Sequence, residues 1–178
     1  MDFSLIFAEP AVTLGRFADF CSLHMKFNGQ IAVEASREAV FAKLRDIHFF
    51  ASCIDGVSAL SPDGETRFNA ELATKVAYMT FRFKVSVELT ELVAPERIAA
   101  RIEGAPTGLV GRLTAISSTQ LTASESGGTL IDYEIDTALT GKLGSIGQPV
   151  LKAKAKDMEK QFAKNLRAAF AAADKEVS

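Results

Sequence analysis

Apolar and polar residues alternate along most of the chain, and the period of this pattern changes near the C-terminus. The clearest alternation spans residues 79–90, where apolar residues such as Phe81 and Phe83 alternate with polar residues such as Arg82 and Lys84. A period of two predicts a β-strand with one buried side and one solvent-facing side. Similar patterns cover residues 26–34, 57–60, 66–74, 98–102, 112–123 and 129–139. The chain is therefore expected to form seven strands.

Helical patterns occur after the first strand and at the end of the chain. Ser36 is suited to the N-cap of a short helix that ends at Arg45, and a second short helical segment covers residues 46–52. From about residue 148 to Ala173 the period becomes 3.6, which is typical of an amphipathic helix. Its apolar face comprises Leu151, Ala155, Met158, Phe162, Leu166, Ala169 and Phe170. One long helix is therefore expected to follow the last strand.

The order of these elements predicts an α+β domain. A curved, seven-stranded antiparallel sheet would pack on one long C-terminal helix, with two short helices after the first strand. The 178 residues are enough for a single domain with a sizeable core. We assign residues 25–173 to this domain, residues 1–24 to a poorly ordered N-terminal extension and residues 174–178 to a short tail.

A sheet of seven strands is wider than one helix, which is only about 10–12 Å across. The sheet must therefore curl around the helix, and two arrangements remain open: a space between helix and sheet, or an ordinary close-packed core. The side chains on the inward side are almost all apolar, so the expected content of such a space is an apolar small molecule. The candidate lining residues are Phe68, Phe81, Phe83, Tyr133, Met158 and Phe162.

Composition and charge exclude several other classes of protein. The formal net charge is −2, so the chain lacks the positive charge that binding to nucleic acid normally requires. No apolar run reaches the 18–20 or so residues that a membrane-spanning helix needs. Cys21 and Cys53 have no zinc-ligand spacing with each other or with the two histidines. We expect free thiols and a cytoplasmic location.

Residues with catalytic chemistry are few and scattered. His48 has no visible partner that would make it a general acid or base, and no nucleophile signature surrounds Cys53. Asp132, Glu134 and Asp136 alternate along one predicted strand, where a solvated face explains them better than a metal site. We therefore predict no catalytic residue, no metal and no cofactor, and expect a binding protein more than an enzyme.

Several segments are similar to one known family. The matching segments are MKFNGQIAVEASREAVFAKLRD, CIDGVSAL, FRFKVSVELTELVAPERIAARIEG, GGTLIDYEIDTALTGKLGSIGQPVL and AKDMEKQFAKNL. Between about Met25 and Ala171 the chain resembles the family of the carbon monoxide dehydrogenase G protein, within the polyketide cyclase and START-related superfamily. The resemblance implies a helix-grip fold, which the periodicity also predicts. It further implies an accessory protein that binds a quinone or lipid-like molecule and serves a molybdenum-containing carbon monoxide dehydrogenase.

Three functions remain open from the sequence. The first is non-catalytic binding and transfer of an apolar molecule. The second is a cyclase or hydrolase that acts inside the cavity and depends on Tyr78, Tyr133 or His48. The third is an assembly chaperone for a molybdenum hydroxylase. The lysines on the C-terminal helix, from Lys152 to Lys164, are either an ordinary solvated face or a contact with the inner face of a membrane.

Overall fold

The computed structural model describes residues 22–173 and confirms the predicted α+β architecture. The strands are β1 (Leu23–Val33), β2 (Val57–Pro62), β3 (Arg67–Val76), β4 (Met79–Val93), β5 (Arg97–Pro106), β6 (Gly111–Ala123) and β7 (Thr129–Gly141). The helices are α1 (Arg37–Arg45), α2 (Ile47–Ser52), the short 3-10 helix η1 (Gly144–Ile146) and α3 (Gln148–Ala173). Two short helices follow β1 and one long helix follows β7, as the sequence predicts.

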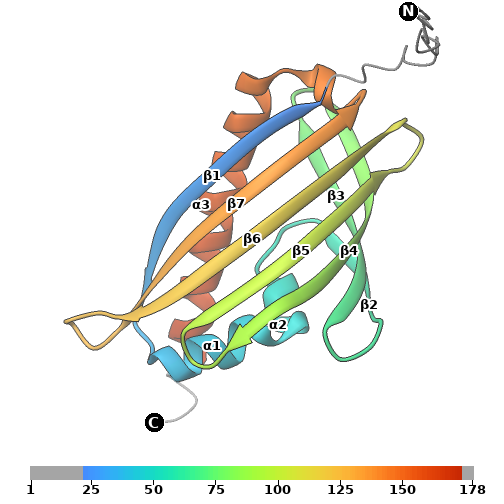
Figure 1. Cartoon of the computed structure of the whole chain (residues 1–178). Helices are drawn as coiled ribbons and strands as arrows, with labels where there is room; N and C mark the ends of the chain where they lie inside the picture. The colour runs from blue at the N-terminus through green and yellow to red at the C-terminus, as the bar shows by residue number, and fades with distance from the viewer. Residues whose placement is uncertain (1–21, 174–178) are drawn as a thin grey trace, which may run out of the picture.

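All seven strands form one antiparallel sheet in the order β1-β7-β6-β5-β4-β3-β2. The sheet curves around α3, so that it has a concave side toward the helix and a convex side toward solvent (Figure 1). The backbone of α3 comes closest to β1 and β3, which lie near the two edges of the sheet. The helix therefore bridges the two sides of the curved sheet.

The two short helices begin at side-chain caps. The Ser36 hydroxyl accepts a hydrogen bond from the backbone N–H of Ala39, which starts α1 as predicted. The Asp46 carboxylate accepts from the N–H groups of His48 and Phe49 and starts α2 directly after α1. Such caps satisfy N–H groups that have no partner within the helix. They place both helices at the lower end of the sheet in Figure 1.

Several boundaries differ from the sequence prediction. The loop expected between Gly104 and Gly111 is wrong in extent, because β5 continues through Pro106 and only a short turn remains. The Thr107 N–H donates to the Arg82 carbonyl at 2.7 Å, so pairing with β4 holds this segment extended. β1 begins at Leu23, slightly before the expected domain start. The proposed extension at 1–21 and the tail at 174–178 lie outside the described residues and stay predictions.

Buried apolar residues form two separate clusters rather than one continuous core. We call the first the lower cluster, because it lies beside α1 and α2 at the lower end. It comprises Ile31, Val33, Val40, Phe41, Cys53, Ile98, Leu121, Ile131, Ala163, Leu166 and Phe170. The upper cluster lies where α3 begins and comprises Met25, Val76, Phe81, Phe83, Leu139 and Leu143. The region between the clusters carries the candidate site.

Candidate functional site

A strip of apolar residues on the concave side lies between the two clusters and belongs to neither. The strip, called the central strip below, comprises Val87, Ile102, Ile135 and Met158. Val87 and Ile102 are directly opposite each other on β4 and β5. All four side chains are only partly buried, although they point toward α3 and not to the convex side. Apolar area that stays partly accessible inside a fold is available for an apolar guest.

Hydrogen bonds fix α3 mainly at its C-terminal half. Arg167 Nε donates to the Ala32 carbonyl of β1 at 3.0 Å. On the other side of the helix, Asn165 Nδ2 donates to the Cys53 carbonyl at 3.1 Å and lies 3.3 Å from Asp55 Oδ1. These contacts hold the helix to β1 and to the end of α2, next to the lower cluster. They leave the segment of α3 that carries Met158 to rest on side-chain packing.

Tyr133 provides a polar group at the border between the strip and β1. It lies on β7 directly opposite Gly29 of β1, and its ring crosses the space that a side chain at position 29 would fill. Glu159 of α3 reaches the same place, so its carboxylate lies beside the tyrosine hydroxyl. Burial raises the pKa of Tyr133, and the side-chain hydrogen bond and negative charge of Glu159 raise it further. The tyrosine therefore stays protonated as a hydrogen-bond donor.

The structure distributes the six predicted lining residues over different environments. Phe81 and Phe83 are buried in the upper cluster, with ring centroids 6.3 Å apart. Phe162 contacts Phe50, with ring centroids 5.4 Å apart, and, like Tyr133, packs against the lower cluster. Phe68 is buried outside both clusters, and Met158 belongs to the central strip. The six residues all point inward, but they do not meet as one group.

Three members of the central strip are absent from the set chosen by sequence. Val87, Ile102 and Ile135 are aliphatic, whereas that choice favoured aromatic residues. Alternation already placed all three on the inward side of their strands. The available signal was therefore their position midway along each strand, between residues that pack at either end.

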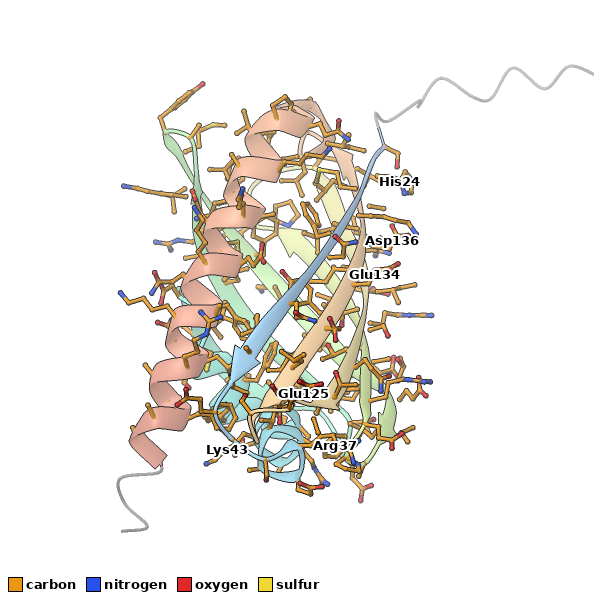
Figure 2. The ribbon with its side chains drawn as sticks, turned by 90° about the vertical axis from the view of Figure 1, so that its left-hand side faces the viewer. His24, Arg37, Lys43, Glu125, Glu134 and Asp136 are labelled. Carbon is orange, nitrogen blue, oxygen red and sulfur yellow. The ribbon has the colours of Figure 1, made fainter. Side chains whose placement is uncertain are left out.

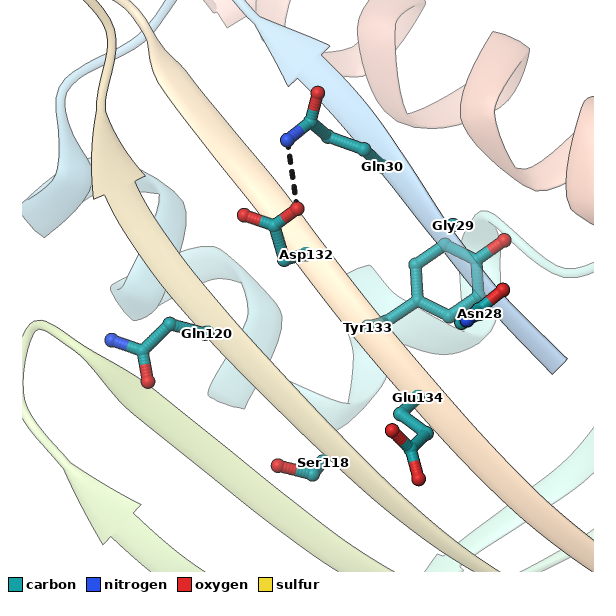
Figure 3. Close-up of a pocket in the computed structure, with 8 residues that line it drawn as sticks. All are labelled: Asn28, Gly29, Gln30, Ser118, Gln120, Asp132, Tyr133 and Glu134. Carbon is teal, nitrogen blue, oxygen red and sulfur yellow. Dashed lines mark hydrogen bonds between the residues drawn. The ribbon is translucent and has the colours of Figure 1, made fainter. Parts of the chain in front are cut away.

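Two hollows in the described part of the chain lie on the convex side. The larger, of about 540 Å³, is open to solvent, and Gln30 Nε2 donates to Asp132 Oδ1 at 2.7 Å at its border (Figure 3). Its lining residues are Asn28, Gly29, Gln30, Ser118, Gln120, Asp132, Tyr133 and Glu134. The second, of about 460 Å³, is also lined largely by polar residues of the outer face. Neither hollow lies between α3 and the sheet, so the candidate site rests on accessible apolar side chains.

The residues considered for catalysis are far apart. His48 is exposed on α2 at the lower end, whereas Tyr78 is exposed at the β3–β4 hairpin at the upper end. Tyr133 lies on the concave side between them. Cys53 is buried, and this burial raises the pKa of its thiol, which disfavours the reactive thiolate. The structure brings none of these groups into one site.

The acidic residues of β7 face solvent. Lys26 of β1 pairs with Glu134 at 3.7 Å and with Asp136 at 3.3 Å on the convex side (Figure 2). Within residues 22–173, no group of three or more His, Cys, Asp or Glu side chains is arranged to hold a metal ion. These carboxylates therefore belong to a charged outer surface.

Comparison with known families decides the classification. The family model for the carbon monoxide dehydrogenase G protein (CoxG) matches residues 29–171. The chain belongs to the CoxG family. A search of curated proteins finds no match.

Solved structures agree with the fold of this CoxG family member. A conserved protein from Geobacillus kaustophilus is 26% identical, with a TM-score of 0.76 over 83% of this chain and 95% of that one. A START superfamily protein from Mycobacterium smegmatis is 12% identical, with a TM-score of 0.60 over 82% and 97%. Ara h 8.0201 is 12% identical, with a TM-score of 0.58 over 84% and 99%. These similarities show a START-like helix-grip fold, which is typical of proteins that bind hydrophobic ligands.

No helix within residues 22–173 combines the length and the apolar character needed to cross a bilayer.

Proposed function

We propose that this CoxG family member binds and transfers an apolar small molecule of the quinone or lipid type, without catalysing a reaction on it. The observation that carries the proposal is the central strip. Its apolar side chains face α3 yet remain partly accessible, while the clusters on either side are buried. Covering apolar surface contributes about 25 cal/mol per Å², so a ligand along the strip would gain affinity from burial alone.

Tyr133 supports a ligand that has one polar end. Its protonated hydroxyl lies at the border of the strip, beside Glu159. A quinone carbonyl or a lipid head group could accept a hydrogen bond there, while the apolar remainder lies along Ile135 and Met158. A few placed polar groups in an apolar site commonly fix the orientation of a ligand.

The proposed cellular role follows from the family. A CoxG protein would act as an accessory to a molybdenum-containing carbon monoxide dehydrogenase, in the cytoplasm or at the inner face of the membrane. The assembly-chaperone role predicts stable binding to such an enzyme in a pull-down, with or without an apolar ligand. The carrier role predicts a co-purifying ligand.

Native mass spectrometry of the full chain tests the carrier role, with decylubiquinone and oleic acid as probes. Ile102→Thr removes apolar surface from the strip and is expected to weaken binding of at least one probe by roughly five- to tenfold. Ile116→Thr is the matched control, because Ile116 is 59% exposed on the convex side of the same sheet. Absence of an adduct with both probes, or equal weakening by the two substitutions, would refute the proposal.

A further inference from the structure

Exposed apolar side chains gather at the upper end of the molecule, on three different segments. Tyr78 and Met79 lie at the β3–β4 hairpin, and Tyr78 is 90% exposed. Leu109 and Val110 lie in the β5–β6 turn, where Val110 is 66% exposed, and Val150 lies in the first turn of α3. Large apolar residues this exposed at projecting turns are unfavourable in water and suggest a contact that covers them.

Contacts in the structure bring these three segments together. The Lys142 N–H donates to the Val110 carbonyl at 3.0 Å, which joins the β5–β6 turn to the segment that leads into α3. Val76, next to the β3–β4 turn, belongs to the upper cluster together with Leu143, and Leu151 of α3 packs against that cluster. Figure 1 shows these segments at the end of the sheet where α3 begins.

The same segments carry only positive charge. Residues 72–87, 104–124 and 137–156 contain no Asp or Glu. Exposed basic residues on them near this end include Lys75, Arg82, Arg112, Lys142 and Lys152. None of these side chains takes part in the ion pairs found within residues 22–173. We call this surface the basic apolar end.

The opposite end of the sheet has a different character. Leu92 and Val93 are also exposed there, at the β4–β5 turn. Their neighbours, however, include Glu91, which pairs with Arg97 at 3.2 Å, and Glu96, which lies 3.8 Å from Arg37. Exposed apolar residues therefore occur at both ends, but unpaired positive charge accompanies them only at the upper end.

We propose that the basic apolar end docks this protein on the surface of an anionic lipid bilayer. Separate apolar turns can insert among acyl chains while the lysines around them contact anionic head groups. A protein partner fits less well, because lysine is depleted in protein interfaces and the apolar residues project from separate turns without forming one flat patch. The inference rests on the proposed membrane contact and names the surface and the lipid charge that it requires.

Vesicle flotation of the full chain tests this docking. Vesicles of phosphatidylcholine with 30% phosphatidylglycerol, by mole, are compared with pure phosphatidylcholine at about 0.1 M salt. Binding is expected on the anionic vesicles and should fall strongly at 0.5 M salt. Lys75→Gln and Lys142→Gln should each lower the partition coefficient about fivefold. Tyr78→Ser combined with Val110→Ser should lower it by at least roughly tenfold.

Matched variants at the opposite end decide which surface is responsible. Leu92→Ser combined with Val93→Ser, and separately Lys43→Gln, should leave binding to anionic vesicles within about twofold of the wild type. Failure of the wild type to bind anionic vesicles, equal binding to both vesicle types, or equal losses from variants at the two ends would overturn the proposal. Ile102→Thr serves as a separate readout, because it tests the ligand site and should leave flotation unchanged.

Discussion

The lower cluster and the central strip are built by the same strands and the same helix, yet only the lower cluster is fully packed. In the lower cluster Leu121 and Leu166 are 0% exposed, and α1 adds Val40 and Phe41 to the contact between sheet and α3. Beside the strip, no short helix of the described chain is present to add such side chains. The difference shows that the two short helices, and not α3 alone, close the interior of the curved sheet. Stability and binding are therefore expected to map to different parts of one concave surface.

Leu166→Ala should have the largest effect on stability. Leu166 is fully buried among residues of β1, α1 and β6, so truncation removes apolar contacts and leaves a cavity. The expected loss in the free energy of unfolding is about 2–5 kcal/mol, measured by urea denaturation. Leu92→Ala, at an exposed position of β4, should cost less than about 1 kcal/mol. Similar costs at the two positions would contradict the packing described for the lower cluster.

Gly29→Ala should have an intermediate effect. A Cβ at position 29 would overlap the hydroxyl of Tyr133 and lie 2.8 Å from Glu159 Oε1. The tyrosine must then move, at an expected cost of about 1–3 kcal/mol in the free energy of unfolding. In a Tyr133→Ala background the same substitution should cost much less, since the overlapping ring is gone. A double-mutant cycle without such coupling would show that the ring does not occupy the space beside Gly29.

Met158→Ala should affect stability less than either of these changes. Met158 is partly exposed and belongs to neither buried cluster, so its truncation removes less contact than truncation of Leu166. The expected loss is roughly 1 kcal/mol in urea denaturation, accompanied by weaker binding of decylubiquinone. A loss as large as that of Leu166→Ala would mean that the strip is packed like the lower cluster.

The smallest expected effect is a change in stability at alkaline pH. Because the pKa of Tyr133 is raised in the folded protein, the protonated tyrosine favours folding fully below the unfolded pKa of about 10. That contribution is lost as the pH rises from about 10 toward the higher pKa of the folded state. Tyr133→Phe should therefore lose less stability than the wild type between about pH 9 and pH 11.5. Tyr78→Phe provides the reference for removing an exposed hydroxyl, and identical profiles for the two variants would contradict the environment described for Tyr133.

Much of the fold could be predicted because its signals are local. The caps at Ser36 and Asp46 act on N–H groups only a few residues away, and alternation sets the inward side of every strand. The extent of β5 could not be predicted, because Gly104 and Pro106 are typical of loops, whereas pairing with β4 keeps them in the strand. Among the candidate site residues, inward orientation was predictable, but the separation of Phe81 from Phe162 depends on the register of strands distant in sequence.

The sequence by itself determined the seven strands, the two short helices, the long helix and the apolar character of the side that faces it. Periodicity suffices for this, because the direction of each side chain follows from the geometry of its own element. Only the tertiary structure decided which inward side chains are fully buried and which remain accessible. That outcome depends on where α1, α2 and α3 cover the curved sheet, and no pattern within a single element records it. The meeting of three segments without acidic residues at one end has the same origin, since strand pairing places them side by side.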